Sequence, residues 1–200
     1  MKRFLGFFMA AVLLIAAFLV LPIHGEAGIY DNVIRLHVLA NSDSESDQAL
    51  KLAVRDAVLE KTHTLLQNVD SRAQAEAVLQ KHLPELEAAA VNALRQLGAE
   101  NSVAVAMGQE HYPTRQYEQL AFPAGEYLSL RVMIGEAKGQ NWWCVLFPPL
   151  CLSAASQQNT EAVCLSAGLS GEQYRVIADT DSTTYKLRFK ILEVAESIFG

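Results

Sequence analysis

The sequence has 200 residues, 51% of them hydrophobic, and a formal net charge of −6. This length and apolar content suffice for one sizeable core, so we expect a single globular domain. The acidic balance, without any cluster of Lys and Arg, argues against a nucleic-acid partner, because that affinity comes largely from neutralising phosphates. A Gly-rich phosphate loop and an HExxH pair are both absent from the sequence, so we expect neither a cofactor nor a metal ion.

The N-terminus has the pattern of an export signal. Lys2 and Arg3 precede a run from Phe4 to Ile23 without charged residues, and small residues follow it. Positive charges before such a run keep the N-terminus cytoplasmic and send the following chain across the membrane. The run is about long enough to span a bilayer. Residues 1–27 are therefore expected to be a signal peptide or a signal anchor, which contacts the membrane before or without cleavage.

A strand and a long helix are predicted at the start of the exported part. Apolar residues alternate with Arg35 and His37, which is the period of a half-buried strand. Ser44, with Asp47 three residues later, resembles a capping box. Apolar residues at helical spacing then predict a helix from about Glu45 to Leu66.

Two further helices are expected after this one. Ser71 is the candidate cap of the first, and Pro84 predicts a break with a new helix starting near it, because proline is strained in a helix interior. Gly98 ends the second helix.

The remaining strands are predicted from alternation and turn residues. They cover residues 101–107, an irregular edge strand at 111–117, and residues 126–134 and 142–147. Because "GEAKGQN" between the last two is rich in turn residues, we expect these two strands to form a hairpin. Residues 152–172 have the composition of a flexible linker, and residues 173–200 are expected to form a C-terminal helical segment.

The order of elements predicts an α+β fold, with residues 28–151 as its main domain. We expect a two-layer sandwich, in which a mostly antiparallel sheet of about five strands carries helices on one face, after the N-terminal signal or anchor helix. Arg35, His37, Ser129 and Arg131 then point away from the helices, together with at least one of the two tryptophans in "WWCVLF". Aromatic residues beside arginines on an open face are typical of a protein-binding patch. The alternative is that the C-terminal segment buries this face.

The stretch "NWWCVLFPPLC", residues 141–151, contains two of the three cysteines. Cys144 and Cys151 are the natural pair for a disulfide in an exported protein, with Cys164 left over. A bridge needs Cα atoms within about 7 Å, which a Pro-Pro turn permits but does not require. The other possibility is a reactive thiol at Cys144 with His37 or His111 as base, in a secreted hydrolase of the cell envelope.

The residues favour binding over catalysis. Cys144 lies mid-strand among large apolar residues, where an inert or bridged cysteine is far commoner than a reactive one. Asp43, Asp47 and His37 match the spacing of no known metal-ligand loop, and the carboxylates suit a helix N-terminus. We therefore expect the protein not to be an enzyme.

Three motifs resemble the stage II sporulation protein R family of endospore-forming Firmicutes. They are "IRLHVLANSDSESDQALKLAVRDAVL" (34–59), "FPAGEY" (122–127) and "NWWCVLFPPLC" (141–151). "YPTRQYEQL" between them is also similar, through Pro113, Thr114 and Tyr117.

The resemblance implies a signalling role in sporulation. Proteins of this family are made in the forespore and exported into the space between the two septal membranes. There they trigger a membrane-embedded aspartic protease of the mother cell, which removes an inhibitory pro-sequence from a sigma factor. On this basis we expect Arg35, His37, Arg131, Trp142 and Trp143 to include the contacts to the protease. A structural component bridging the two membranes is a further possibility.

Overall fold

The computed structural model describes residue 6 and residues 26–117, 120–151 and 160–178. Nearly all of the expected export signal and the last part of the expected C-terminal segment, residues 179–200, lie outside the described residues. The described part contains six helices and six strands and confirms the α+β class. No helix within it is long and apolar enough to cross a membrane.

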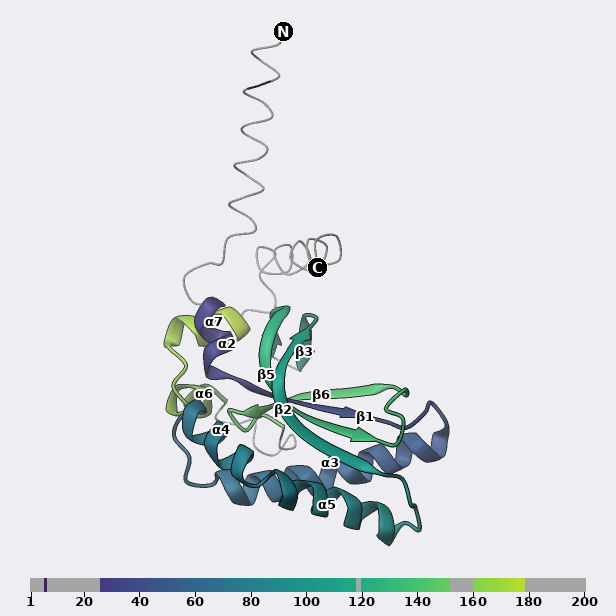
Figure 1. Ribbon diagram of the computed structural model, residues 1–200. Helices are drawn as coiled ribbons and strands as arrows, with labels where there is room; N and C mark the ends of the chain where they lie inside the picture. The colour runs from purple at the N-terminus through teal and green to yellow at the C-terminus, as the bar shows by residue number, and fades with distance from the viewer. Residues whose placement is uncertain (1–5, 7–25, 118–119, 152–159, 179–200) are drawn as a thin grey trace. The chain divides into compact units, whose positions relative to one another are not determined.

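The elements are shown in Figure 1. In chain order they are α2 (Glu26–Asn32), β1 (Ile34–Leu39), α3 (Glu45–Leu66), α4 (Arg72–Lys81), α5 (Leu83–Gln96), β2 (Val103–Tyr112), β3 (Arg115–Tyr117), β4 (Leu120–Phe122), β5 (Gly125–Ile134), β6 (Asn141–Phe147), α6 (Thr160–Ser166) and α7 (Gly171–Ala178). They form two compact units. The larger unit comprises residues 30–110 and 126–169, and the smaller unit includes residues 111–125 and the chain from residue 170 onward. The domain limits expected from the sequence stay predictions.

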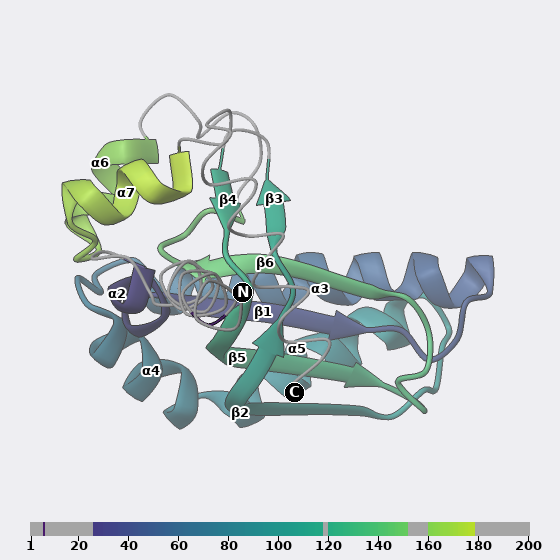
Figure 2. The same cartoon turned by 90° about the horizontal axis from the view of Figure 1, so that it is seen from above.

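The larger unit is built on a mixed sheet of four strands in the order β2-β5-β1-β6 (Figure 2). β1 is parallel to β5 and antiparallel to β6. The expected sheet of about five mostly antiparallel strands is instead a mixed sheet of four, because β1 runs parallel to β5. The parallel neighbours β1 and β5 are separated in the sequence by three helices and three strands. A parallel pair needs such a long connection.

The predicted hairpin of β5 and β6 is also wrong, because β1 lies between these two strands. The connecting loop, residues 135–140, crosses the end of β1 and lies against the turn that follows it. Gly139 N donates to Ala40 O at 2.9 Å, and a side chain at Gly139 would collide with the Ser42 backbone. Six residues easily span two strand spacings of about 4.8 Å each, so short loop length did not exclude this topology.

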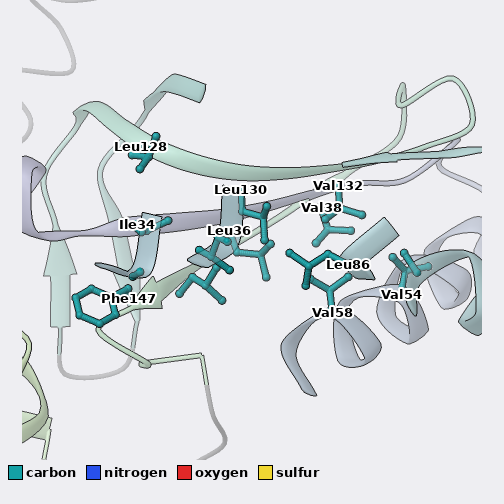
Figure 3. Packing of buried hydrophobic residues seen from close by; sticks show 14 of the residues in the cluster. Ile34, Leu36, Val38, Val54, Val58, Leu86, Leu128, Leu130, Val132 and Phe147 are labelled. Atoms are coloured by element: carbon teal, nitrogen blue, oxygen red, sulfur yellow. The ribbon is translucent and has the colours of Figure 1, made fainter. Parts of the chain in front are cut away.

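One face of this sheet packs on α3, α4 and α5, as expected (Figure 3). Ile34, Leu36 and Val38 of β1 point into this core. The other sheet strands and the helices contribute Val54, Val58, Ala75, Leu79, Leu86, Ala90, Leu94, Leu128, Leu130, Val132 and Leu146, all of them buried. Strand alternation therefore directs Arg35 and His37 to the opposite face.

The predicted helix boundaries are confirmed. α3 begins at Glu45 and ends at Leu66, and the Ser44 side chain accepts the hydrogen bond of Asp47 N. Ser71 caps α4 in the same way, and α5 begins at the Pro84 break, with proline in its first turn. Gly98, at φ 73°, follows the end of α5 in the left-handed conformation that favours glycine.

The smaller unit contains a separate two-stranded antiparallel sheet, β3 with β4. α7 packs against β4. Tyr112, Phe122 and Ile177, which belong to this unit, are fully buried. The region 152–172, expected to be a flexible linker, contains the helix α6 and the start of α7, so the Ser, Ala and Gln content of this region did not exclude helices.

Candidate partner-binding face

We define the outer face as the side of the four-stranded sheet opposite α3, α4 and α5. Each strand contributes to it. Its residues are Arg35 and His37 from β1, Glu110 from β2, Ser129 and Arg131 from β5, and Trp143 from β6, with Asn141 at the start of β6. Figure 2 shows this sheet with its four strands side by side.

His37 is the centre of a polar cluster on this face. Its register partners are Arg131 on β5 and Trp143 on β6. His37 Nδ1 donates to the Glu110 carboxylate at 2.7 Å, and His37 Nε2 lies 2.8 Å from Oδ1 of Asn141. The ring of His37 also packs on the Trp143 ring, with centroids 5.3 Å apart. His37 on β1 thus contacts its neighbour β6, through Asn141 and Trp143, and reaches across β5 to Glu110 on β2.

Glu110 is the acidic member of this cluster. Burial of its carboxylate disfavours the charged form, but hydrogen bonds from His37 and Ser129 and the charges of His37 and Arg131 outweigh this effect and lower the pKa of Glu110. Arg131 Nε lies 3.5 Å from Glu110 Oε1. The Arg131 side chain is 40% exposed and the Glu110 side chain 17%, so Arg131 is the charge that this cluster presents to solvent.

Arg35 and His37 are not available on an open face, contrary to expectation. Arg35 has no exposed surface, and His37 is 6% exposed. Arg35 Nε donates to Cys144 O at 3.3 Å, and its guanidinium carbon lies 4.9 Å from the centroid of the Tyr127 ring. A stacked, hydrogen-bonded, fully buried guanidinium supports the fold of the sheet, and a partner cannot reach it without rearrangement.

The two adjacent tryptophans lie on opposite faces. Trp142 packs against the helix-side core, and the guanidinium carbon of Arg55 lies 5.0 Å from its ring centroid. Trp143 is half-buried on the outer face beside His37. Of the residues inferred from sequence, Arg131 and Trp143 therefore combine the outer face with accessible surface, whereas Trp142 belongs to the helix side.

The surroundings of the three cysteines disfavour a reactive thiol. Cys144 and Cys151 form a disulfide with Cα atoms 5.7 Å apart, and a bridged Cys144 has no thiol to act as a nucleophile. Cys164 is buried, and its burial raises the pKa of the thiol to about 11, which disfavours the reactive thiolate. The hydrolase expected as the alternative has no support from this geometry.

The acidic residues near the start of α3 accept hydrogen bonds from other residues of this protein. Asp47 accepts hydrogen bonds from the side chains of Ser42 and Asn41, which lower its pKa despite an opposing contribution from burial. Asp43 accepts from Gln140 N at 2.7 Å, across the loop between β5 and β6. In the part of the chain that the structure describes, no group of three or more His, Cys, Asp and Glu residues is placed to hold a metal ion.

A pocket of about 310 Å³ lies elsewhere in the larger unit. It is enclosed by the end of α3, the turn after β6 and the helix α6. Leu59, Leu66, Leu146, Phe147, Pro149 and Val163 supply its apolar lining. The pocket is a small apolar cleft, and it is separate from the polar cluster around His37.

The sequence interpretation missed Glu110 and Asn141. A strand expected to end at residue 107 in fact continues to Tyr112. Val103, Val105 and Met107 face the helix side, so the same alternation would have placed Glu110 on the outer face. Asn141 was assigned to a turn, although it is the first residue of β6. The alternation along this strand was therefore sufficient to predict that Glu110 lies on the outer face.

The described fold and site define an α+β protein with a polar, aromatic sheet face and a disulfide-closed edge strand. Comparison with known families identifies it further. The family model for stage II sporulation protein R matches residues 30–157, which contain the whole four-stranded sheet and helices α3 to α5. The chain belongs to the stage II sporulation protein R family and is a sporulation protein.

A relative named stage II sporulation protein R, from Bacillus subtilis (strain 168), is 43% identical over 135 residues. The match covers 68% of this chain and 59% of the relative, so the chain spans about three fifths of the length of that protein. No solved structure matches this chain.

Proposed function

We propose that this protein is an exported sporulation signal that activates a membrane-embedded aspartic protease of the mother cell. The activated protease removes the inhibitory pro-sequence of a sporulation sigma factor. The observation that carries the proposal is the family match over residues 30–157, together with an N-terminal segment that has the charge pattern of an export signal. The site of action is then the space between the two septal membranes.

The contact surface is centred on Trp143 and Arg131. Tryptophan and arginine are the residue types enriched at energetically dominant interface positions. Trp143 is held by stacking on His37, and Arg131 by the Glu110 carboxylate, so both side chains lose little freedom when a partner arrives. The exposed Arg131 guanidinium is a positive group on this face and favours an acidic position on the protease.

The buried members of the cluster act as positioning residues. His37 bonds to Glu110 and to Asn141 and packs on Trp143, so its loss would release all three neighbours. Arg35 supports the strand that carries Trp143, through its bond to Cys144 O.

The proposal is tested by reconstitution in non-sporulating cells. The full chain is co-expressed with the membrane protease and the pro-sigma factor, and loss of the pro-sequence is followed by immunoblot. We expect processing only when the protein is exported, and none from a matched chain without residues 1–27 or with a protease lacking its catalytic aspartate. Absence of processing, with all three proteins present and the chain located outside the cytoplasmic membrane, would refute the activator function.

A further inference from the structure

The four-stranded sheet has two edge strands, and they are protected differently. At β6, the last strand on the other side, the bridge from Cys151 to Cys144 holds the chain after the strand close to it, with the two Cα atoms 5.7 Å apart. At β2, no strand of the described residues pairs with the outer edge (Figure 2). Residues 101–109 at this edge contain neither a charged residue nor a proline, the two devices that commonly prevent edge-to-edge pairing.

The direction of the backbone groups of β2 can be read from two hydrogen bonds. Ser102 O accepts from Gly135 N at 2.8 Å, so residue 102 faces β5. Val105 N donates to the exposed Glu87 side chain of α5 at 3.4 Å, so residue 105 faces away from β5. Because successive residues of a strand alternate, Val103, Val105 and Met107 direct their backbone donors and acceptors outward.

We propose that the edge of β2 is the interface of a symmetric dimer of this protein. Two copies of β2 paired antiparallel about Val105 place each outward donor opposite an outward acceptor. In this register Val103 lies opposite Met107 of the second copy, and Ala104 lies opposite Ala106. An interface with two-fold symmetry requires a surface that is complementary to itself, and this segment meets that requirement.

The side chains agree with this register on both faces of the sheet. Ala104 and Ala106 are small and exposed on the outer face, so they leave room for a second strand. Val103, Val105 and Met107 are half-buried against the helix-side core and extend that core to the edge. Glu87 is an exposed side chain at a long hydrogen-bond distance, so it is readily displaced by a backbone carbonyl.

The paired strands would join two four-stranded sheets into one sheet of eight. The outer faces of the two copies then lie on the same side, since the two-fold axis is perpendicular to the sheet. Two identical faces directed the same way fit a partner that is itself two-fold symmetric. The dimer itself does not depend on the proposed function, because it follows from the β2 edge alone.

The test uses the full chain in mild non-ionic detergent, with its molar mass measured by sedimentation equilibrium over a range of concentrations. We expect a reversible dimer. Val105→Pro removes an outward donor, which an edge strand tolerates, and should weaken dimerisation about tenfold or more. Because this variant changes the backbone, its folding is checked by circular dichroism.

A pair of double variants tests the register through exposed side chains. Ala104→Lys with Ala106→Lys places lysine opposite lysine at two symmetric positions and should weaken the dimer about tenfold. Ala104→Lys with Ala106→Glu places opposite charges at the same positions and should restore wild-type affinity to within about threefold. A monomeric wild-type chain at every concentration would overturn the proposal, and so would equal dimer affinities for the two double variants. Both results are independent of pro-sigma processing.

Discussion

Two arginines on the same sheet face have opposite surroundings. Arg35 is fully buried, stacked on Tyr127 and bonded to Cys144 O, whereas the Arg131 side chain is 40% exposed beside Glu110. We predict that Arg35→Met lowers the free energy of unfolding by about 2–4 kcal/mol, since it leaves a buried carbonyl without its donor and removes the stacked cation. Arg131→Met should change it by less than about 1 kcal/mol. Urea denaturation of the two variants checks this, and equal losses would contradict the assigned roles.

The Glu110 carboxylate should make stability depend on pH. Its pKa is lowered in the folded protein from an ordinary value of 4.5. The unfolded chain therefore takes up the proton first as the pH falls, so the stabilisation is present above about pH 4.5 and is lost as the pH falls through the folded value.

Glu110→Gln is the matched variant for this effect, because it keeps the shape of the side chain and removes the charge. We predict a loss of about 1–2 kcal/mol at pH 7, with a difference from wild type that vanishes as the pH approaches 3. Thermal unfolding across this range measures it. A constant difference at all pH values would show that the charge of Glu110 contributes nothing.

At the scale of elements, the position of β1 between β5 and β6 depends on the loop that joins these two strands and crosses the end of β1. Asn41 Oδ1 accepts from Glu136 N at 2.9 Å, and Lys51 Nζ donates to Gln140 O at 3.1 Å, so the loop is bonded to the turn after β1 and to α3. Desolvation of this buried lysine lowers the pKa of Lys51, with a contribution from the charge of Arg55.

Gly139→Ala should disturb this arrangement, because the added Cβ collides with backbone atoms of Ser42, which cannot move aside as the end of a flexible side chain could. We predict a loss of about 2–3 kcal/mol in the free energy of unfolding. Gly108→Ala in β2 is the control, since nothing lies within 4 Å of a Cβ there, and it should be neutral or slightly stabilising. Similar values for the two variants would argue against the close contact of the two loops.

The disulfide should contribute stability and no chemistry. Cys144 and Cys151 lie seven positions apart, and closing a loop of this length is worth about 2–3 kcal/mol in the chain-entropy model. We therefore expect Cys144→Ser and Cys151→Ser to lose similar amounts and to retain processing activity where they still fold. Loss of activity in Cys144→Ser alone, with its stability unchanged, would instead favour the hydrolase.

Helices were easier to predict than strand neighbours. The limits of α3 follow from the Ser44 cap and the apolar period, and the break before α5 follows from Pro84, which are local features. The position of β1 between β5 and β6 depends on pairing between distant segments, and alternation in a strand does not name its partner. Because alternation does not identify a partner, the closeness of β5 and β6 in the sequence led to the wrong prediction of a hairpin.

At the scale of the whole molecule, the motifs were sufficient to predict the family, because "NWWCVLFPPLC" and the strand-helix segment near Ser44 are long and unusual. The composition of the candidate face was also predictable from strand alternation. Its accessibility was not, since the burial of Arg35 and His37 depends on packing that no local pattern encodes. The polar partners of His37 likewise come from β2 and β6, far away in the sequence.

The adjacent tryptophans provide the most direct test of the proposed activator face, because they differ in the side of the sheet that they occupy. Trp143→Ala and Trp142→Phe are compared in the reconstituted processing assay, with export and thermal unfolding measured for both. We predict that Trp143→Ala reduces the processing rate by about tenfold or more while remaining exported and folded. Trp142→Phe should process at close to the wild-type rate. Wild-type processing by an exported, folded Trp143→Ala protein would show that the outer face is not the activator surface.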